Sequence, residues 1–252
     1  MAATDPRFEY LLHLGDNCLV LGQRLAALCG HGPALEENIA ITNVALDLIG
    51  QARLWLTYAG EVEGRGRDED KLAFLRDGHE FRNCLLVEQP NGNYAETIAR
   101  QFYFDTWHYF ALNALSRSTD ARIADIAAKS LKEVRYHLER SSDWVVRLGD
   151  GTEESHRKMQ AALDWLWSYT GELFEASAVD AALVAEGVAF APASIRGDWL
   201  AHVEEILEEA TLALPTGTWM QCGGREGRHS EHLGYLLAEM QFLQRAYPGA
   251  QW

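Results

Sequence analysis

The chain has 252 residues, of which 48% are apolar, and its 37 acidic and 22 basic side chains give a formal net charge of -15. This length suits one large domain with a substantial core, and the charge disfavours nucleic acid and anionic membranes as partners. No uncharged apolar run reaches the ~18 residues of a membrane span, and the N-terminus lacks the signal-peptide pattern. The four cysteines show neither a disulfide framework nor zinc-site spacing, so we expect a cytoplasmic protein.

The first half of the chain predicts long helices. Residues 7–29 carry apolar side chains at alternating steps of three and four, as in an amphipathic helix. A second helix is expected over residues 35–60, where between Asn38 and Gly60 the only charges are Asp47 and Arg53. So few charges predict a helix that is buried on most sides. A polar loop over 61–70 and a short helix over 78–88 should follow.

The rest of the chain continues the helical pattern. A third helix is expected over 94–117, and Ser118-Thr119-Asp120 offers a cap for a fourth, which Gly149-Asp150-Gly151 ends. Thr152 should cap a fifth helix, which is rich in aromatic residues that we expect in the core: Trp165, Trp167, Tyr169 and Phe174. Further helices fit residues 177–186, 194–212 and 229–245. With no convincing strand and no linker, the sequence predicts one all-α domain over residues 1–252, a ferritin-like four-helix bundle with additional C-terminal helices.

Polar side chains recur on faces of the long helices that should be buried. The first helix offers Asp16 or Gln23, and the candidate groups of the other three helices are Asn43, Asp47, Gln51, Gln101, Asp105, His108, Glu133 and His137. Because charged residues are rarely buried without a partner, we expect these groups to meet inside the bundle. Carboxylates and imidazoles from four helices are typical of a di-iron site.

The spacing of these groups fails the di-iron test. Such sites take one Glu from each of two helices and a Glu-x-x-His pair from each of the other two. Asp47-Leu48-Ile49-Gly50 has glycine where histidine belongs, and Val134-Arg135-Tyr136-His137 has valine where glutamate belongs. We therefore expect a vestigial site without metal or catalytic residues, its polar groups hydrogen-bonded to one another. A working di-iron centre and ordinary helix packing are the alternatives.

Four segments resemble the C subunits (PaaC) of bacterial phenylacetyl-CoA epoxidases. They are ITNVALDLIGQARLWLTYAGEVEG, LLVEQPNGNYAETIARQFYFD, KEVRYHLERSSDWVVRLGDGTEESHRKMQ and HSEHLGYLLAEMQFLQRAYPGAQW. The resemblance implies a ferritin-like subunit without iron ligands in a complex that converts phenylacetyl-CoA to a ring 1,2-epoxide with O2 and NADPH. It also implies three partners: a homologous A subunit that carries the di-iron centre, a small B subunit and a reductase.

Three functions fit the sequence. The chain is expected to be a non-catalytic structural subunit that covers the A subunit, with residues 229–252 as a candidate interface. The alternatives are a catalytically active di-metal ferritin-like oxygenase and an iron-storing ferritin relative. Iron content separates the first two, and self-assembly into a shell would indicate the third.

Overall fold

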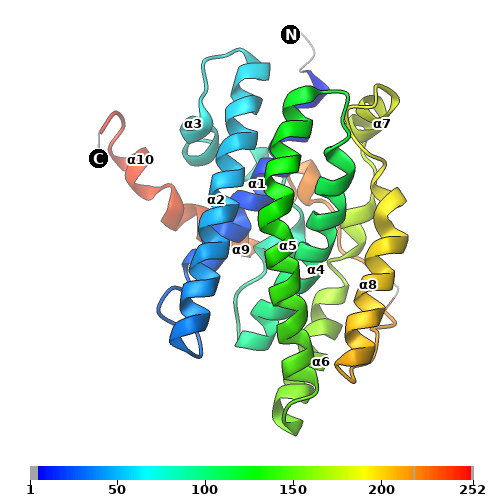
Figure 1. Cartoon of the computed structure of the whole chain (residues 1–252). Coiled ribbons are helices and arrows are strands. Elements are labelled where there is room, and N and C mark those ends of the chain that lie inside the picture. Colours follow the sequence, from blue (N-terminus) through cyan, green and yellow to red (C-terminus); the bar gives the residue numbers. More distant parts are fainter. Residues whose placement is uncertain (1–4, 218, 251–252) are drawn as a thin grey trace. The chain divides into compact units, whose positions relative to one another are not determined.

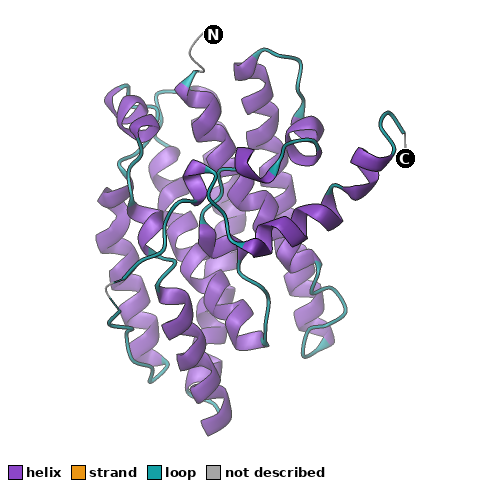
Figure 2. Cartoon of the chain, turned by 180° about the vertical axis from the view of Figure 1, so that it is seen from behind, coloured by secondary structure: helices purple, strands orange, loops and turns teal. Residues whose placement is uncertain are grey.

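The computed structural model describes residues 5–217 and 219–250, and every regular element in these ranges is a helix (Figures 1 and 2). The predicted all-α class is confirmed. None of the helices in the described ranges has the length and hydropathy that a membrane crossing requires.

The described chain divides into two compact units. Unit 1 consists of the residues up to Pro90 together with those from Gly223 onward, and unit 2 consists of Asn91–Cys222. The expectation of a single domain stays a prediction.

Unit 1 is built on a hairpin of two long helices, α1 (Pro6–Ala26) and α2 (Leu35–Glu63), which pack along each other (Figure 1). Their close approach needs glycine: a Cβ added at Gly15 would lie 2.8 Å from Leu56 Cδ2. The shorter elements are α3 (Glu69–Phe74), the 3-10 helices η1 (Gly78–Glu80), η2 (Leu85–Glu88) and η5 (Gly224–Glu226), α9 (Glu231–Met240) and α10 (Phe242–Ala246).

The helix of unit 1 that is buried on most sides is α1, whereas the sequence predicted that it would be α2. On α1, every residue from Tyr10 to Gly22 is buried, so this helix has no solvent-facing stripe over three turns. On α2, Leu35, Ile39 and Leu46 are 70%, 55% and 61% exposed. The scarcity of charge on α2 therefore reflects an exposed apolar face, and the prediction that α2 is buried on most sides is wrong.

The predicted helix over 78–88 is also wrong. The chain there forms η1 and η2, separated by residues without regular structure. Backbone amides of this stretch bond to α1 side chains instead: Arg82 N donates to Asp16 Oδ2 (2.8 Å) and Cys84 N to Asn17 Oδ1 (2.8 Å). These tertiary hydrogen bonds replace the local ones that a helix would supply.

Unit 2 is built on a second long hairpin, α4 (Tyr94–Leu115) and α5 (Ala121–Gly149), which pack along each other (Figure 1). A cap was predicted within Ser118-Thr119-Asp120, and the structure places it at Asp120, which accepts hydrogen bonds from the amides of Arg122 and Ile123. The remaining elements are α6 (Glu153–Trp167), η3 (Gly171–Phe174), α7 (Ala178–Ala185), η4 (Pro192–Ile195) and α8 (Arg196–Glu209).

An aromatic cluster joins the helices of unit 2. The rings of Tyr103, Trp167 and Trp199 lie 5.8 Å apart in each pair, and Trp199 Nε1 donates to the carbonyl of Tyr103 (3.0 Å). Thr152 caps α6 as predicted, by accepting from Ser155 N. Trp165 is 38% exposed, so its predicted place in the core is wrong. It lies roughly 160° around α6 from the buried Leu163.

Candidate functional site

A group of buried polar side chains lies between α4 and α5, and we call Asp105, His108, His137 and Ser141 the α4–α5 polar group. Asp105 and His108 stand one turn apart on α4, and His137 and Ser141 one turn apart on α5. All four are at most 3% exposed. Asp105 interacts electrostatically with His137, and the Ser141 hydroxyl, which donates to the carbonyl of Leu138 (3.3 Å), also favours the charged form of Asp105. Asp105, His108 and His137 were predicted from sequence as site residues, whereas Ser141 was not.

Burial controls the protonation of this group. Desolvation raises the pKa of Asp105 from 3.8 to about 6, against the attraction of His137, the effect of the Ser141 hydroxyl and the positive charges of Arg140 and Arg100. Desolvation, with help from His137, lowers the pKa of His108 from 6.5 to about 3. At neutral pH the group therefore holds a carboxylate beside a neutral His108. The ring of that histidine lies 5.1 Å from Phe104.

Some polar atoms near this group lack hydrogen-bond partners within the described chain. They are Asp105 Oδ1, the Ser130 hydroxyl, and both amide atoms of Gln101, which stands one turn before Asp105. Gln101 and Ser130 are 2% and 0% exposed. Buried polar atoms of this kind are usually satisfied by ordered water, so the α4–α5 polar group is a polar interior and not a dry apolar core.

The buried positions of α2 in unit 1 and of α5 in unit 2 lack the glutamates of the di-iron motif. On α5, Val134 is 0% and His137 1% exposed, whereas Glu133 is only half-buried, so valine does occupy the position of the glutamate. On α2, Gly50 is exposed and the buried pair three residues apart is Leu48 and Gln51. The buried positions that correspond to glutamate and histidine are therefore Leu48 and Gln51. Each lies one residue after the predicted pair, Asp47 and Gly50. This donor set does not fit two irons.

Potential metal ligands do not gather elsewhere in the described chain either. Within residues 5–217 and 219–250, no three or more His, Cys, Asp or Glu side chains are arranged so that they could hold a metal ion.

Asp16, a predicted site residue on α1, forms an ion pair in unit 1. Its carboxylate accepts hydrogen bonds from both terminal nitrogens of Arg76 and from Arg82 N. The side chains of Asp16 and Arg76 are 0% and 1% exposed. The guanidinium also lies 4.2 Å from the centroid of Phe81. A buried aspartate predicts a cationic partner, but nothing in the spacing of the sequence selects Arg76.

The predicted polar row on α2 runs from the surface to the interior. Asn43 is exposed, Asp47 is half-buried and Gln51 is 1% exposed. Gln51 Oε1 accepts a weak hydrogen bond from Cys18 Sγ on α1 (3.8 Å). Arg53, the other charge of this stretch, pairs with Glu69 at the surface (3.2 Å). Only Gln51 of this row is therefore an interior group of unit 1.

A second buried carboxylate in unit 1 was missed by sequence reasoning. Glu88, 0% exposed, accepts from Asn83 Nδ2 (2.9 Å), His229 Nδ1 (2.5 Å), and both the amide and hydroxyl of Ser230 (2.8 and 2.6 Å). These contacts tie η2 to the segment that leads into α9. Glu88 stands in a short polar stretch with no periodicity, so its burial had no sequence signal.

The C-terminal segment that was predicted as an interface has two kinds of residue. Leu233 and Leu236 are 1% and 7% exposed and pack within unit 1. Tyr235, Phe242 and Tyr247 are 69%, 61% and 59% exposed. Residues 251–252 of the predicted interface lie outside the described ranges.

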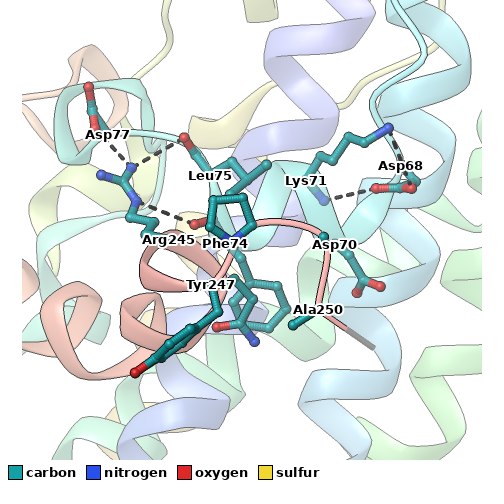
Figure 3. Close-up of a pocket in the computed structure, with 12 residues that line it drawn as sticks. Asp68, Asp70, Lys71, Phe74, Leu75, Asp77, Arg245, Tyr247 and Ala250 are labelled. Carbon is teal, nitrogen blue, oxygen red and sulfur yellow. Dashed lines mark hydrogen bonds and ion pairs between the residues drawn. The ribbon is translucent and has the colours of Figure 1, made fainter. Parts of the chain in front are cut away.

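A cavity of about 700 Å³ opens between α3 and the C-terminal residues of unit 1 (Figure 3). Its two cations are engaged inside the chain. Lys71 Nζ donates to the carbonyl of Gly66 (2.9 Å), and Arg245 donates to Asp77 Oδ1 (2.8 Å) and to carbonyls beside it. Three aspartates line the same cavity: Asp68, Asp70 and Asp77. This acidic excess disfavours a phosphate-bearing ligand such as a CoA thioester.

Comparisons with known proteins agree with the sequence resemblance. A family model described as phenylacetic acid catabolic protein matches residues 1–252. The chain is similar to the C subunit of the 1,2-phenylacetyl-CoA epoxidase of Escherichia coli (strain K12), with 54% identity over 243 residues. The match covers 96% of this chain and 98% of that protein.

Proposed function

The chain belongs to the family of phenylacetic acid catabolic proteins, and from this membership we propose that it is the non-catalytic C subunit of a phenylacetyl-CoA epoxidase. In this role it supports a homologous A subunit, which holds the di-iron centre and epoxidises the ring of phenylacetyl-CoA. A small B subunit and a reductase that takes electrons from NADPH complete the proposed complex, which acts in the cytoplasm.

The identity of the buried residues Leu48 and Val134 carries the non-catalytic part of the proposal. These positions stand three residues before Gln51 and His137, where a di-iron helix has glutamate. An aliphatic side chain cannot donate an electron pair to iron. The remaining buried groups, chiefly Asp105, His108 and His137, are too few to hold two metals.

We also propose that the fold is ferritin-like, with the hairpins α1–α2 and α4–α5 as the four long helices of a bundle. Two long helical hairpins, each with polar groups on a buried face, support this assignment. An experimental structure of the chain in which these hairpins do not pack as four helices would contradict it.

Iron counting tests the non-catalytic role. The chain should be purified alone, loaded anaerobically with Fe(II), freed of excess metal and analysed. We expect far less than one iron per chain and no O2-dependent turnover of phenylacetyl-CoA. Nearly two irons per chain with turnover would instead establish the alternative, an active di-metal oxygenase that uses the α4–α5 polar group.

Reconstitution tests the supporting role. The complex should be assembled with the wild-type chain and with His137→Gln, using Leu75→Gln at the surface as the matched control. Both variants should support the same turnover as wild type wherever they assemble. A His137→Gln complex that assembles fully but loses most of its turnover would contradict a purely structural role.

A further inference from the structure

The exposed face of α2 is an apolar stripe in an otherwise acidic protein. Its exposed residues recur at steps of three and four over five turns: Leu35, Ile39, Asn43, Leu46, Gly50 and Arg53. Glu36, also exposed, borders the stripe at its start. At 100° per residue these side chains fall within an arc of roughly 100°, the width of a helix-packing seam.

Depletion of charge distinguishes this stripe from an ordinary solvent-facing surface. The chain carries a net charge of -15, yet none of the exposed positions between Glu36 and Arg53 holds a formal charge. Leu46, at the centre of the stripe, is 61% exposed. Missing charges together with exposed aliphatic side chains are the compositional signal of an interface core.

Gly50 marks a hollow in the stripe. It stands inside a 29-residue helix, where glycine is unfavourable relative to alanine. A Cβ added there would meet nothing within 4 Å, so the contacts inside the chain do not require glycine at this position. A helix surface without a side chain at this point can accept a knob from another helix.

The stripe is complementary to itself in antiparallel orientation. We propose that it binds α2 of a second copy of this chain, about a two-fold axis that passes between Val44 and Ala45. Glu36 and Arg53 are equally far from this midpoint, at about 13 Å along the helix axis. Each therefore meets its opposite charge on the second copy, at both ends of the interface.

The same register matches shapes along the rest of the seam. Ile39 and Gly50 are also equidistant from the midpoint, so each Ile39 enters the hollow at Gly50 of the second copy. Asn43 and Leu46 are equidistant from the midpoint too, so each Leu46 lies level with Asn43 of the second copy, and the two Leu46 positions are about 4.5 Å apart along the helix axis. Asn43 lies equally close to the axis, and a single polar residue in an apolar seam fixes its register.

Arg53 is available for this contact. Its side chain is 75% exposed, and its Nε donates to Glu69. The guanidinium has five N–H donors in a fork, so its terminal nitrogens can donate to a second carboxylate.

Sedimentation of the isolated full chain over a concentration range of about 1–100 µM tests the proposal by mass action. We expect a monomer–dimer equilibrium that Leu46→Glu weakens about 100-fold. Leu75→Glu, at an exposed leucine off the stripe (52% exposed), is the matched control and should leave it unchanged. Glu36→Arg should weaken the dimer, and Glu36→Arg with Arg53→Glu should restore at least part of it.

Gly50→Leu separates assembly from folding. Leucine at this position should raise the Tm of the chain by improving helix propensity, because the space is open, but it should abolish the dimer by filling the hollow. Circular dichroism of each variant shows that the monomer has folded, so a lost dimer is not a lost fold.

Cross-linking tests the register. In a background with the exposed Cys29 and Cys222 replaced by serine, Ile39→Cys with Gly50→Cys should give a disulfide-linked dimer on oxidation. A chain that stays monomeric at every concentration, or a dimer indifferent to Leu46→Glu, overturns the proposal. A stripe that becomes protected only when a different family member is added also overturns it, and assigns the surface to that partner. No outcome depends on epoxidase activity, so the proposed function is tested separately.

Discussion

Asp16 on α1 and Arg76 after α3 form an ion pair in which neither side chain is more than 1% exposed. The arginine donates from both terminal nitrogens, and the carboxylate accepts from Arg82 N as well. The pair thereby fixes the irregular chain around η1 against the most buried helix of unit 1. A carboxylate that looks like a metal ligand in the sequence is therefore part of the scaffold.

Replacing Arg76 by methionine should destabilise the chain by roughly 3–5 kcal/mol, because Asp16 would remain buried without a counter-charge. Urea denaturation at neutral pH measures the change. Lys158→Met is the matched control: it removes the exposed pair with Glu154 and should leave the free energy of unfolding nearly unchanged. Equal changes in the free energy of unfolding for the two variants would show that the buried pair contributes no more to stability than an exposed pair.

Replacing Asp105 by asparagine should stabilise the chain at neutral pH. The folded-state pKa of about 6 lies above the usual 3.8, so between these pH values the folded chain holds a proton that the unfolded chain releases. The contribution of Asp105 to stability is therefore highest below about pH 4 and falls as pH rises through 6. Asp105→Asn removes this loss, which amounts to roughly 2–3 kcal/mol.

The measurement is the difference in free energy of unfolding between Asp105→Asn and wild type at several pH values. The difference should grow from about pH 4 to about pH 6 and then stay constant. Asp143→Asn, at an exposed position on α5, serves as the control. A destabilised Asp105→Asn variant at pH 7 would mean that the contacts with His137 and Ser141 outweigh burial.

Replacing His108 by phenylalanine should make the chain less sensitive to acid. The folded-state pKa of His108, about 3, lies below the usual 6.5, so the unfolded chain takes up a proton first as pH falls. The stabilisation by neutral His108 is complete above about pH 6.5 and is lost as pH falls toward 3. Between pH 7 and 4, the variant should lose roughly 3 kcal/mol less stability than wild type. If the free energy of unfolding falls equally with pH for the variant and for wild type, His108 is not held neutral by burial.

Replacing Glu88 by glutamine should loosen the attachment of the C-terminal helices. The Glu88 carboxylate accepts hydrogen bonds from Asn83, His229 and Ser230. An amide nitrogen in place of one oxygen leaves at least one donor unsatisfied, which costs about 1–3 kcal/mol. Hydrogen exchange of α9 amides should speed up correspondingly. Glu226→Gln, in an exposed pair with Arg228, should leave that exchange unchanged.

The sequence alone determined the long helices and the defect in the metal motif. Spacing of apolar residues and the capping side chains of Asp120 and Thr152 are local signals, and the structure reproduces the helices that they predict. The valine three residues before His137 is likewise readable without coordinates. Both inferences depend only on periodicity and on the chemistry of side chains within one helix.

Tertiary structure decided which faces are buried and which charges meet. A helix as poor in charge as α2 has no strong polar side to mark its outside, so periodicity did not reveal that Gly50 is exposed and Gln51 buried. Residues 81–84 are not helical, because the amides of Arg82 and Cys84 donate to the side chains of Asp16 and Asn17 on α1. The partner of Asp16 lies 60 positions away in the sequence. Long-range contacts of this kind have no local sequence signature, because they depend on how distant segments pack.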